Sequence, residues 1–246
     1  MNYYRICLLD QPKSSWVVHE IVKPLPKPAH KEGLPPVLHK FFPSADANVR
    51  MKPRYERLCC DQCGSYDTDA MYDAGFTEPV AIRFKQDFGY TDDRIFVMND
   101  KCVRVLSEAK VGGYETQPIG TSGWNACRVT ERVQCVDTAI RTFPPNCSKC
   151  GSPKDAGSSI LFLSWISAPT STKVLFATLP GCRALSMRDR DTFFTEEVLE
   201  ILKRGKIKGP YCERLWTDEE ARTQEEKEKQ GVAWRPKGGT VYLSGK

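Results

Sequence analysis

Residues 191–216 read DTFFTEEVLEILKRGKIKGPYCERLW, and the spacing of the apolar residues changes along them. The run TFF predicts a short buried strand. Thr195, followed by two glutamates and then by apolar residues at helical spacing, predicts a capped helix over residues 196–206. Gly209 predicts the end of that helix, and the residues after it predict a strand. The segment therefore predicts a strand–helix–strand unit.

A second unit of the same kind is predicted earlier in the chain. RIFVM at residues 94–98 predicts a buried strand, Asn99 or Asp100 predicts a helix cap, and residues 100–110 predict the helix. A glycine pair predicts its end before another strand, YETQPI. Helix patterns also match by chance, so an internal repeat is one of two interpretations. The gapless alignment that supports it pairs Val103 with Leu199, Val105 with Ile201, Leu106 with Leu202, Lys110 with Lys206 and Gly113 with Gly209.

The other apolar segments predict additional strands. Alternation in MNYYRICLLD, residues 1–10, predicts an opening strand, and WVVHEIV, residues 16–22, predicts the next. The proline-rich residues 23–36 predict an extended surface loop. Residues 125–143 are rich in Val, Thr and Ile and predict one or two strands. The sequence therefore predicts an α+β fold with mixed or antiparallel sheets and a few short helices.

The last 30 residues differ in composition from the rest of the chain. TDEEARTQEEKEKQG, residues 217–231, has six acidic and three basic residues and predicts an exposed helix or a linker. Residues 240–243 predict an edge strand. We therefore expect a core over residues 1–216, followed by an appended segment over 217–246.

Two cysteine motifs predict a metal site. The chain has eleven cysteines, and an odd number argues against a complete disulfide framework. RLCCDQCGSY at 57–66 and PPNCSKCGSP at 144–153 each contain Cys-x-x-Cys-Gly. Such a turn places two thiolates on one side of a metal, and zinc takes four thiolates in a tetrahedron. The pattern predicts one structural Zn²⁺ bound by Cys60, Cys63, Cys147 and Cys150.

The spacing of the two motifs predicts how the core is organised. The motifs occupy residues 59–64 and 147–151, and 83 residues, 64–146, separate their paired cysteines. Loop-closure entropy grows only logarithmically with length, so a segment of this size can be enclosed. We expect an inserted lobe over 65–146 and a second lobe over 152–216. A thioredoxin-type redox pair and unmetallated thiols are the alternatives.

The remaining cysteines predict core packing rather than chemistry. Cys59 lacks the spacing that pairs Cys60 with Cys63. The others sit singly in apolar surroundings, where cysteine is a small buried residue: Cys7, Cys102, Cys127, Cys135, Cys182 and Cys212.

Catalytic motifs do not emerge from the sequence. The three histidines, His19, His30 and His39, do not form a metalloprotease motif, and neither a nucleophile elbow nor a P-loop is present. A deaminase needs His-x-Glu, which is missing. Zinc held by four thiolates also has no open position for a substrate. We expect a protein that is not an enzyme.

Charge and hydropathy limit the kinds of partner and the cellular locations that we expect. The net charge is +5, and residues 1–58 alone carry ten Lys/Arg against five Asp/Glu. This excess makes a zinc-ribbon nucleic-acid-binding protein the alternative function. No apolar run has the length of a membrane helix, and the N-terminus lacks the features of a signal peptide. We expect a cytoplasmic protein that does not enter the membrane.

The paired motifs resemble the signature of a bacterial family of double-CxxCG proteins. CDQCG and CSKCG correspond to its two motifs, and the resemblance extends over about residues 1–216 through MNYYRICLLD, SSILFLSWISAP and RDTFFTEEVLEILKRGKIKGPYCERL. Members are described as immunity proteins, which bind and block a toxin delivered by contact between kin. The resemblance implies a cytoplasmic, non-catalytic protein whose partner is a cognate toxin.

Overall fold

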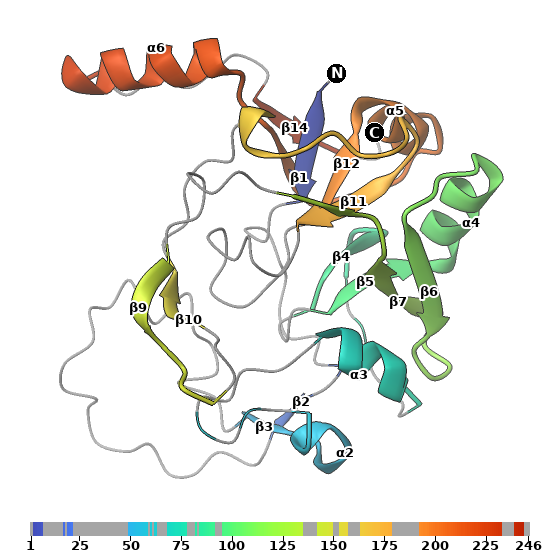
Figure 1. Cartoon of the computed structure of the whole chain (residues 1–246). Helices are drawn as coiled ribbons and strands as arrows, with labels where there is room; N and C mark the ends of the chain where they lie inside the picture. The colour runs from blue at the N-terminus through green and yellow to red at the C-terminus, as the bar shows by residue number, and fades with distance from the viewer. Residues whose placement is uncertain are drawn as a thin grey trace.

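The protein has an α+β fold, as the sequence predicts. Its structure is a computed structural model, in which two larger sheets lie one above the other beside a few short helices (Figure 1). It describes residues 2–6, 17, 19–21, 49–58, 60, 62, 68–77, 82, 84–91, 95–134, 142–149, 153–156, 163–178, 192–232 and 239–243. Within these residues, no helix is both long and apolar enough to cross a membrane.

The larger sheet has six strands drawn from the whole length of the chain. Its order is β14-β13-β1-β12-β11-β8, and every pairing is antiparallel except the parallel one between β11 and β8. The predicted opening strand is present at its centre and the predicted terminal strand at its edge. The bounds are β1 Tyr3–Ile6, β8 Arg132–Val133, β11 Leu175–Thr178, β12 Thr192–Thr195, β13 Tyr211–Arg214 and β14 Thr240–Tyr242.

The second sheet is local and antiparallel, with the order β4-β5-β7-β6. Its strands are β4 Phe88–Tyr90, β5 Phe96–Asn99, β6 Tyr114–Pro118 and β7 Trp124–Val129. One helix follows the equivalent strand of each sheet: α4 Asp100–Glu108 follows β5, and α5 Glu196–Arg204 follows β12. The two helices contact each other and share one apolar core with both sheets.

Smaller elements surround the two sheets. Two of them are strand pairs, β2 His19–Ile21 with β3 Val49–Met51, and β9 Thr142–Asn146 with β10 Pro153–Ala156. The others are α2 Pro53–Glu56, α3 Thr68–Ala74, the 3₁₀ turn η3 Leu163–Trp165 and α6 Asp218–Lys229.

The two predicted strand–helix–strand units have the same local structure at a constant separation of 96 residues, as from Lys110 to Lys206. Asn99 caps α4, with its side-chain oxygen accepting from the Cys102 amide at 2.9 Å. Thr195 caps α5 in the same position and accepts from the Val198 amide. Both predicted caps are confirmed. Each satisfies a backbone donor that the first helical turn leaves without a partner.

The strand pairings extend this equivalence beyond the helices. In the first unit, β7 lies between β5 and β6; in the second, β1 lies in the same way between β12 and β13. Thr116 lies opposite Cys127, and Cys212, 96 residues after Thr116, lies opposite Ile6. The registers of the two sheets therefore agree, with the N-terminal strand in the place that β7 occupies in the first unit.

The helix ends correct one expectation from the sequence. Each helix leads to a lysine in the left-handed region, Lys110 at φ 56° and Lys206 at φ 51°, rather than to a glycine in that role. The glycines lie three residues farther on, at Gly113 and Gly209. Their role is close packing instead of helix termination.

The two units pack closely against each other at these glycines, and each unit supplies one of them. A Cβ at Gly113 would lie 2.1 Å from the Leu175 carbonyl oxygen on β11, and one at Gly209 would lie 2.5 Å from the Phe88 ring on β4. Each unit thus places the turn after its helix against the strand that precedes the other unit and pairs with its first strand. Backbone hydrogen bonds accompany both contacts, including Leu175 N to Gly112 O at 3.0 Å.

We predict that Gly113→Ala lowers the free energy of unfolding by roughly 2 kcal/mol or more, because the methyl group overlaps β11 and the residue has φ +80°. Gly112→Ala is the matched control, since a Cβ there meets nothing within 4 Å and its φ is not positive. Urea unfolding followed by circular dichroism measures both. Equal losses in the two variants would contradict this account of the packing.

Candidate metal centre

The segment that leads into the first motif is held on the end of α3. Tyr55 of α2 is buried and donates its hydroxyl to the Gly75 carbonyl oxygen at 2.8 Å. The Arg54 guanidinium donates to the Ala74 carbonyl and to the Thr77 hydroxyl, just beyond the end of α3. Because the last carbonyls of a helix have no partner within the helix, Arg54 caps α3 and ties the chain before Cys60 to it.

The second motif begins in the turn of the β9–β10 hairpin. Asn146 pairs with Pro153, so the chain from Cys147 onward connects the two antiparallel strands. Figure 1 shows this hairpin standing apart from the two larger sheets. Its turn therefore reaches the first motif from a separate part of the fold.

The structure brings one cysteine of each motif together. The Sγ atoms of Cys60 and Cys147 lie 3.8 Å apart, with Cys147 buried and Cys60 half-buried. Disulfide sulfurs lie about 2.05 Å apart, so this pair is not a disulfide. Four sulfurs placed about 2.3 Å from a tetrahedral zinc lie about 3.8 Å from one another. The observed separation equals that expected for two thiolates on one zinc ion, and it also suits a hydrogen bond between two thiols.

The other two predicted ligands, Cys63 and Cys150, lie outside the described residues, as do Cys59, Cys7, Cys135 and Cys182. Within the described residues, no group of three or more His, Cys, Asp or Glu side chains is positioned to hold a metal ion. The described half of the site consists of the Cys60–Cys147 pair.

A polar contact beside the sulfur pair was not foreseen from the sequence. The Gln62 amide nitrogen lies 3.1 Å from the Ser148 hydroxyl, and that hydroxyl lies 3.2 Å from the Gln62 amide oxygen. Gln62 belongs to the first turn and Ser148 to the second. Neither residue has a signal of its own in the sequence, because their meeting depends on the two turns coming together.

The other described cysteines are core residues, as predicted. Cys102, Cys127 and Cys212 are buried in the core that the two sheets share. Burial raises the pKa of the Cys102 thiol and that of the Cys127 thiol well above the usual range. Both therefore remain protonated at neutral pH, as expected for thiols that pack in a core.

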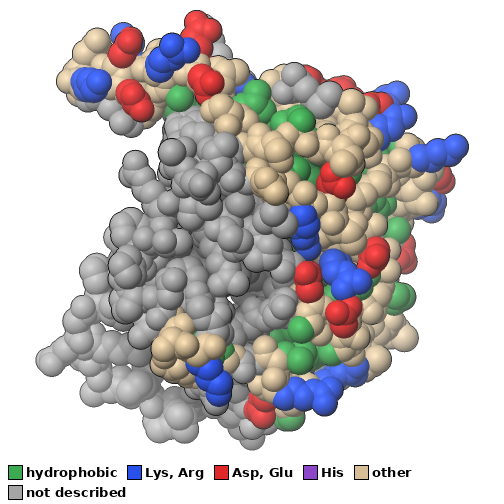
Figure 2. Space-filling model, viewed as in Figure 1, with side chains coloured by type: hydrophobic (Ala, Val, Ile, Leu, Met, Phe, Trp, Pro, Cys, Tyr) green, Lys and Arg blue, Asp and Glu red, His purple; other side chains and the backbone are tan. Residues whose placement is uncertain are grey.

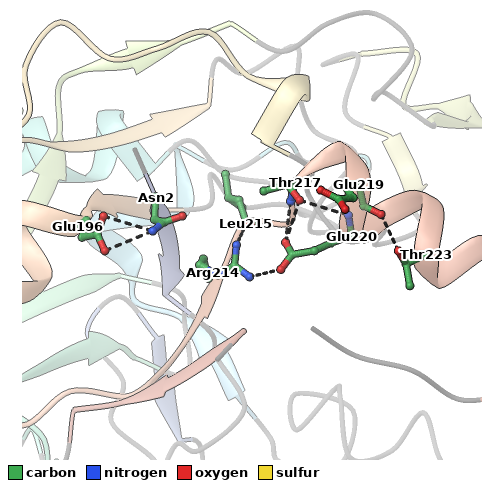
Figure 3. Close-up of polar contacts among 8 residues, drawn as sticks. All are labelled: Asn2, Glu196, Arg214, Leu215, Thr217, Glu219, Glu220 and Thr223. Atoms are coloured by element: carbon green, nitrogen blue, oxygen red, sulfur yellow. Dashed lines mark hydrogen bonds and ion pairs between the residues drawn. The ribbon is translucent and has the colours of Figure 1, made fainter. Parts of the chain in front are cut away.

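The charged segment after Trp216 is a helix, and its first turn is fixed to the six-stranded sheet. Thr217 and Glu220 form a capping box, with Glu220 N donating to Thr217 Oγ1 at 3.2 Å and Thr217 N to Glu220 Oε2 at 2.9 Å. Arg214 of β13 forms an ion pair with Glu220 (Figure 3). The pKa of the Glu220 carboxyl is lowered overall. Burial is the largest single influence and raises the pKa, but the contacts with Arg214 and Thr217 together outweigh burial. The motif Thr-x-x-Glu was the available signal for this helix start.

The outer surface of α6 is charged. Figure 2 shows the helix projecting from the body of the protein with Lys, Arg, Asp and Glu side chains along it. Its exposed residues include both signs, among them Glu219, Arg222, Glu225 and Lys229. Such a surface is typical of a solvated helix.

Comparison of the chain with family models, with curated proteins and with solved structures gives no match.

We predict that Cys102 and Cys127 resist alkylation in the native protein, even at pH 9, because burial keeps both thiols protonated. In buffer with a chelator, the half-buried Cys60 is expected to react before Cys102 and Cys127. Iodoacetamide labelling followed by peptide mass spectrometry measures this order. Labelling of Cys102 as fast as Cys60 without denaturant would show the assignment to be wrong.

Proposed function

We propose that the protein is a non-catalytic immunity protein of the double-CxxCG type, which binds and neutralises a cognate toxin. We further propose that one structural Zn²⁺ is held by Cys60, Cys63, Cys147 and Cys150. The observation that carries the proposal is the 3.8 Å separation of the Cys60 and Cys147 sulfurs, which brings together the two motifs that define the resemblance. The metal would cross-link the two cysteine motifs.

The cross-link would join two parts of the fold. Cys60 follows α2, which is anchored on α3, whereas Cys147 lies in the turn of the β9–β10 hairpin. Zinc bound by thiolates from both sides would fix the hairpin to the segment that α2 anchors on α3, and it would add folding free energy. Such an ordered region suits a protein that acts by binding, since ordered surfaces lose less entropy when they associate.

Ion pairs attach α3 to the four-stranded sheet. Arg128 on β7 lies between Asp73 and Glu115, at 2.5 and 2.7 Å, and its guanidinium stacks over the Tyr72 ring at 4.6 Å. These contacts hold α3 on the sheet, so their role is structural. An ordered scaffold of this kind suits the proposed binding function.

We predict that the purified protein contains one zinc ion per chain, and that Cys60→Ser and Cys147→Ser each abolish its retention, because the remaining thiolates cannot complete the tetrahedron. Cys102→Ala is the matched control, since it removes a buried thiol at another place in the core and leaves the zinc content unchanged. Elemental analysis after gel filtration measures the content. A metal-free protein that is indifferent to a chelator would contradict the proposed site.

The function is tested by co-expression with the product of the neighbouring gene in a sensitive host. We expect that product to be toxic alone and harmless when the intact protein is present. The Cys147→Ser variant should protect poorly, because its hairpin is no longer cross-linked. A toxic neighbour whose effect the intact protein does not change would overturn the proposal, even if zinc is bound.

A further inference from the structure

The two cysteine motifs are joined by a second contact that involves no sulfur. Gln62 and Ser148 are 86 residues apart in the chain, yet the amide nitrogen of Gln62 lies 3.1 Å and its amide oxygen 3.2 Å from the Ser148 hydroxyl. The nitrogen donates to the hydroxyl, and the hydroxyl donates to the oxygen. The Gln62 amide and the Ser148 hydroxyl thus form a ring of two hydrogen bonds. Two bonds fix the orientation of the side chains as well as the distance between them.

Gln62 and Ser148 are each next to a cysteine of the two motifs, so their contact affects how the cysteines are placed. Gln62 directly precedes Cys63, and Ser148 directly follows Cys147. Both residues are exposed, whereas the Cys147 side chain is buried. The amide–hydroxyl pair therefore lies at the surface of the contact between the turns, with the sulfur pair of Cys60 and Cys147 held 3.8 Å apart inside it.

We propose that Gln62 and Ser148 are positioning residues of the metal centre, which hold the two turns in register so that their thiolates converge on one ion. This inference rests on the proposed zinc site. Bringing the turns together across 83 intervening residues, 64–146, costs chain entropy. Each direct bond between the turns offsets part of that cost, so the bond strengthens metal binding without touching the metal. Partners beyond the ligands commonly affect metal affinity in this way.

The test measures the zinc affinity and the zinc release rate of the full-length protein with a competing chromophoric chelator. Gln62→Ala and Ser148→Ala are each expected to weaken zinc binding by about three- to tenfold, as expected for one exposed polar contact. The double variant should be no weaker than either single variant, because both remove the same interaction. Ser148→Thr keeps the hydroxyl and should restore the affinity.

Cobalt substitution checks that each variant keeps the same metal ligands. The Co²⁺ form of each variant should keep the absorption bands of four-thiolate coordination, since the ligands are unchanged, while its Co²⁺ affinity falls in parallel with that for zinc. Unchanged affinity and release rate in a wild-type-like zinc protein would overturn the positioning role alone. Effects that add in the double variant would also overturn it. A wild-type protein that binds neither metal would overturn the zinc site itself.

Discussion

The two strand–helix–strand units depend on two places where backbone meets a neighbour with no room for a side chain. Gly113 lies against Leu175, and Gly209 lies against Phe88. Because the glycine after each helix packs against the strand that precedes the other unit, the interface is nearly self-complementary, as in a symmetric dimer. This reciprocal contact sets α4 beside α5 and encloses a single apolar core between the two sheets. The six-stranded sheet is completed by β1, which crosses from the N-terminus to the place that β7 has in the first unit.

The candidate metal centre lies outside this core and constrains a different part of the chain. Its described half joins the turn of the β9–β10 hairpin to the segment after α2 through the Cys60–Cys147 pair. Apolar packing and the metal would thus stabilise different parts of the protein. The apolar core holds the two units, and the zinc would hold the hairpin that stands apart from them (Figure 1). Loss of the metal is therefore expected to affect the hairpin before the sheets.

Local features were predictable from the sequence, and pairings between distant segments were not. The helices and their caps at Asn99 and Thr195 follow from side chains within one turn of the helix start. The repeated CxxCG motifs predict a shared metal site, and the one contact between them that the structure describes is that of the Cys60 and Cys147 sulfurs. The insertion of β1 between β12 and β13 has no local signal, since strand pairing depends on the whole fold. For the same reason, the contact between Gln62 and Ser148 became visible only in three dimensions.

X-ray absorption at the zinc edge of the purified protein tests directly whether four thiolates from the two distant turns share one zinc ion. We expect four sulfur atoms around the zinc at about 2.3 Å and no nitrogen or oxygen. A shell that contains nitrogen or oxygen, or a protein that carries no zinc, would contradict this expectation.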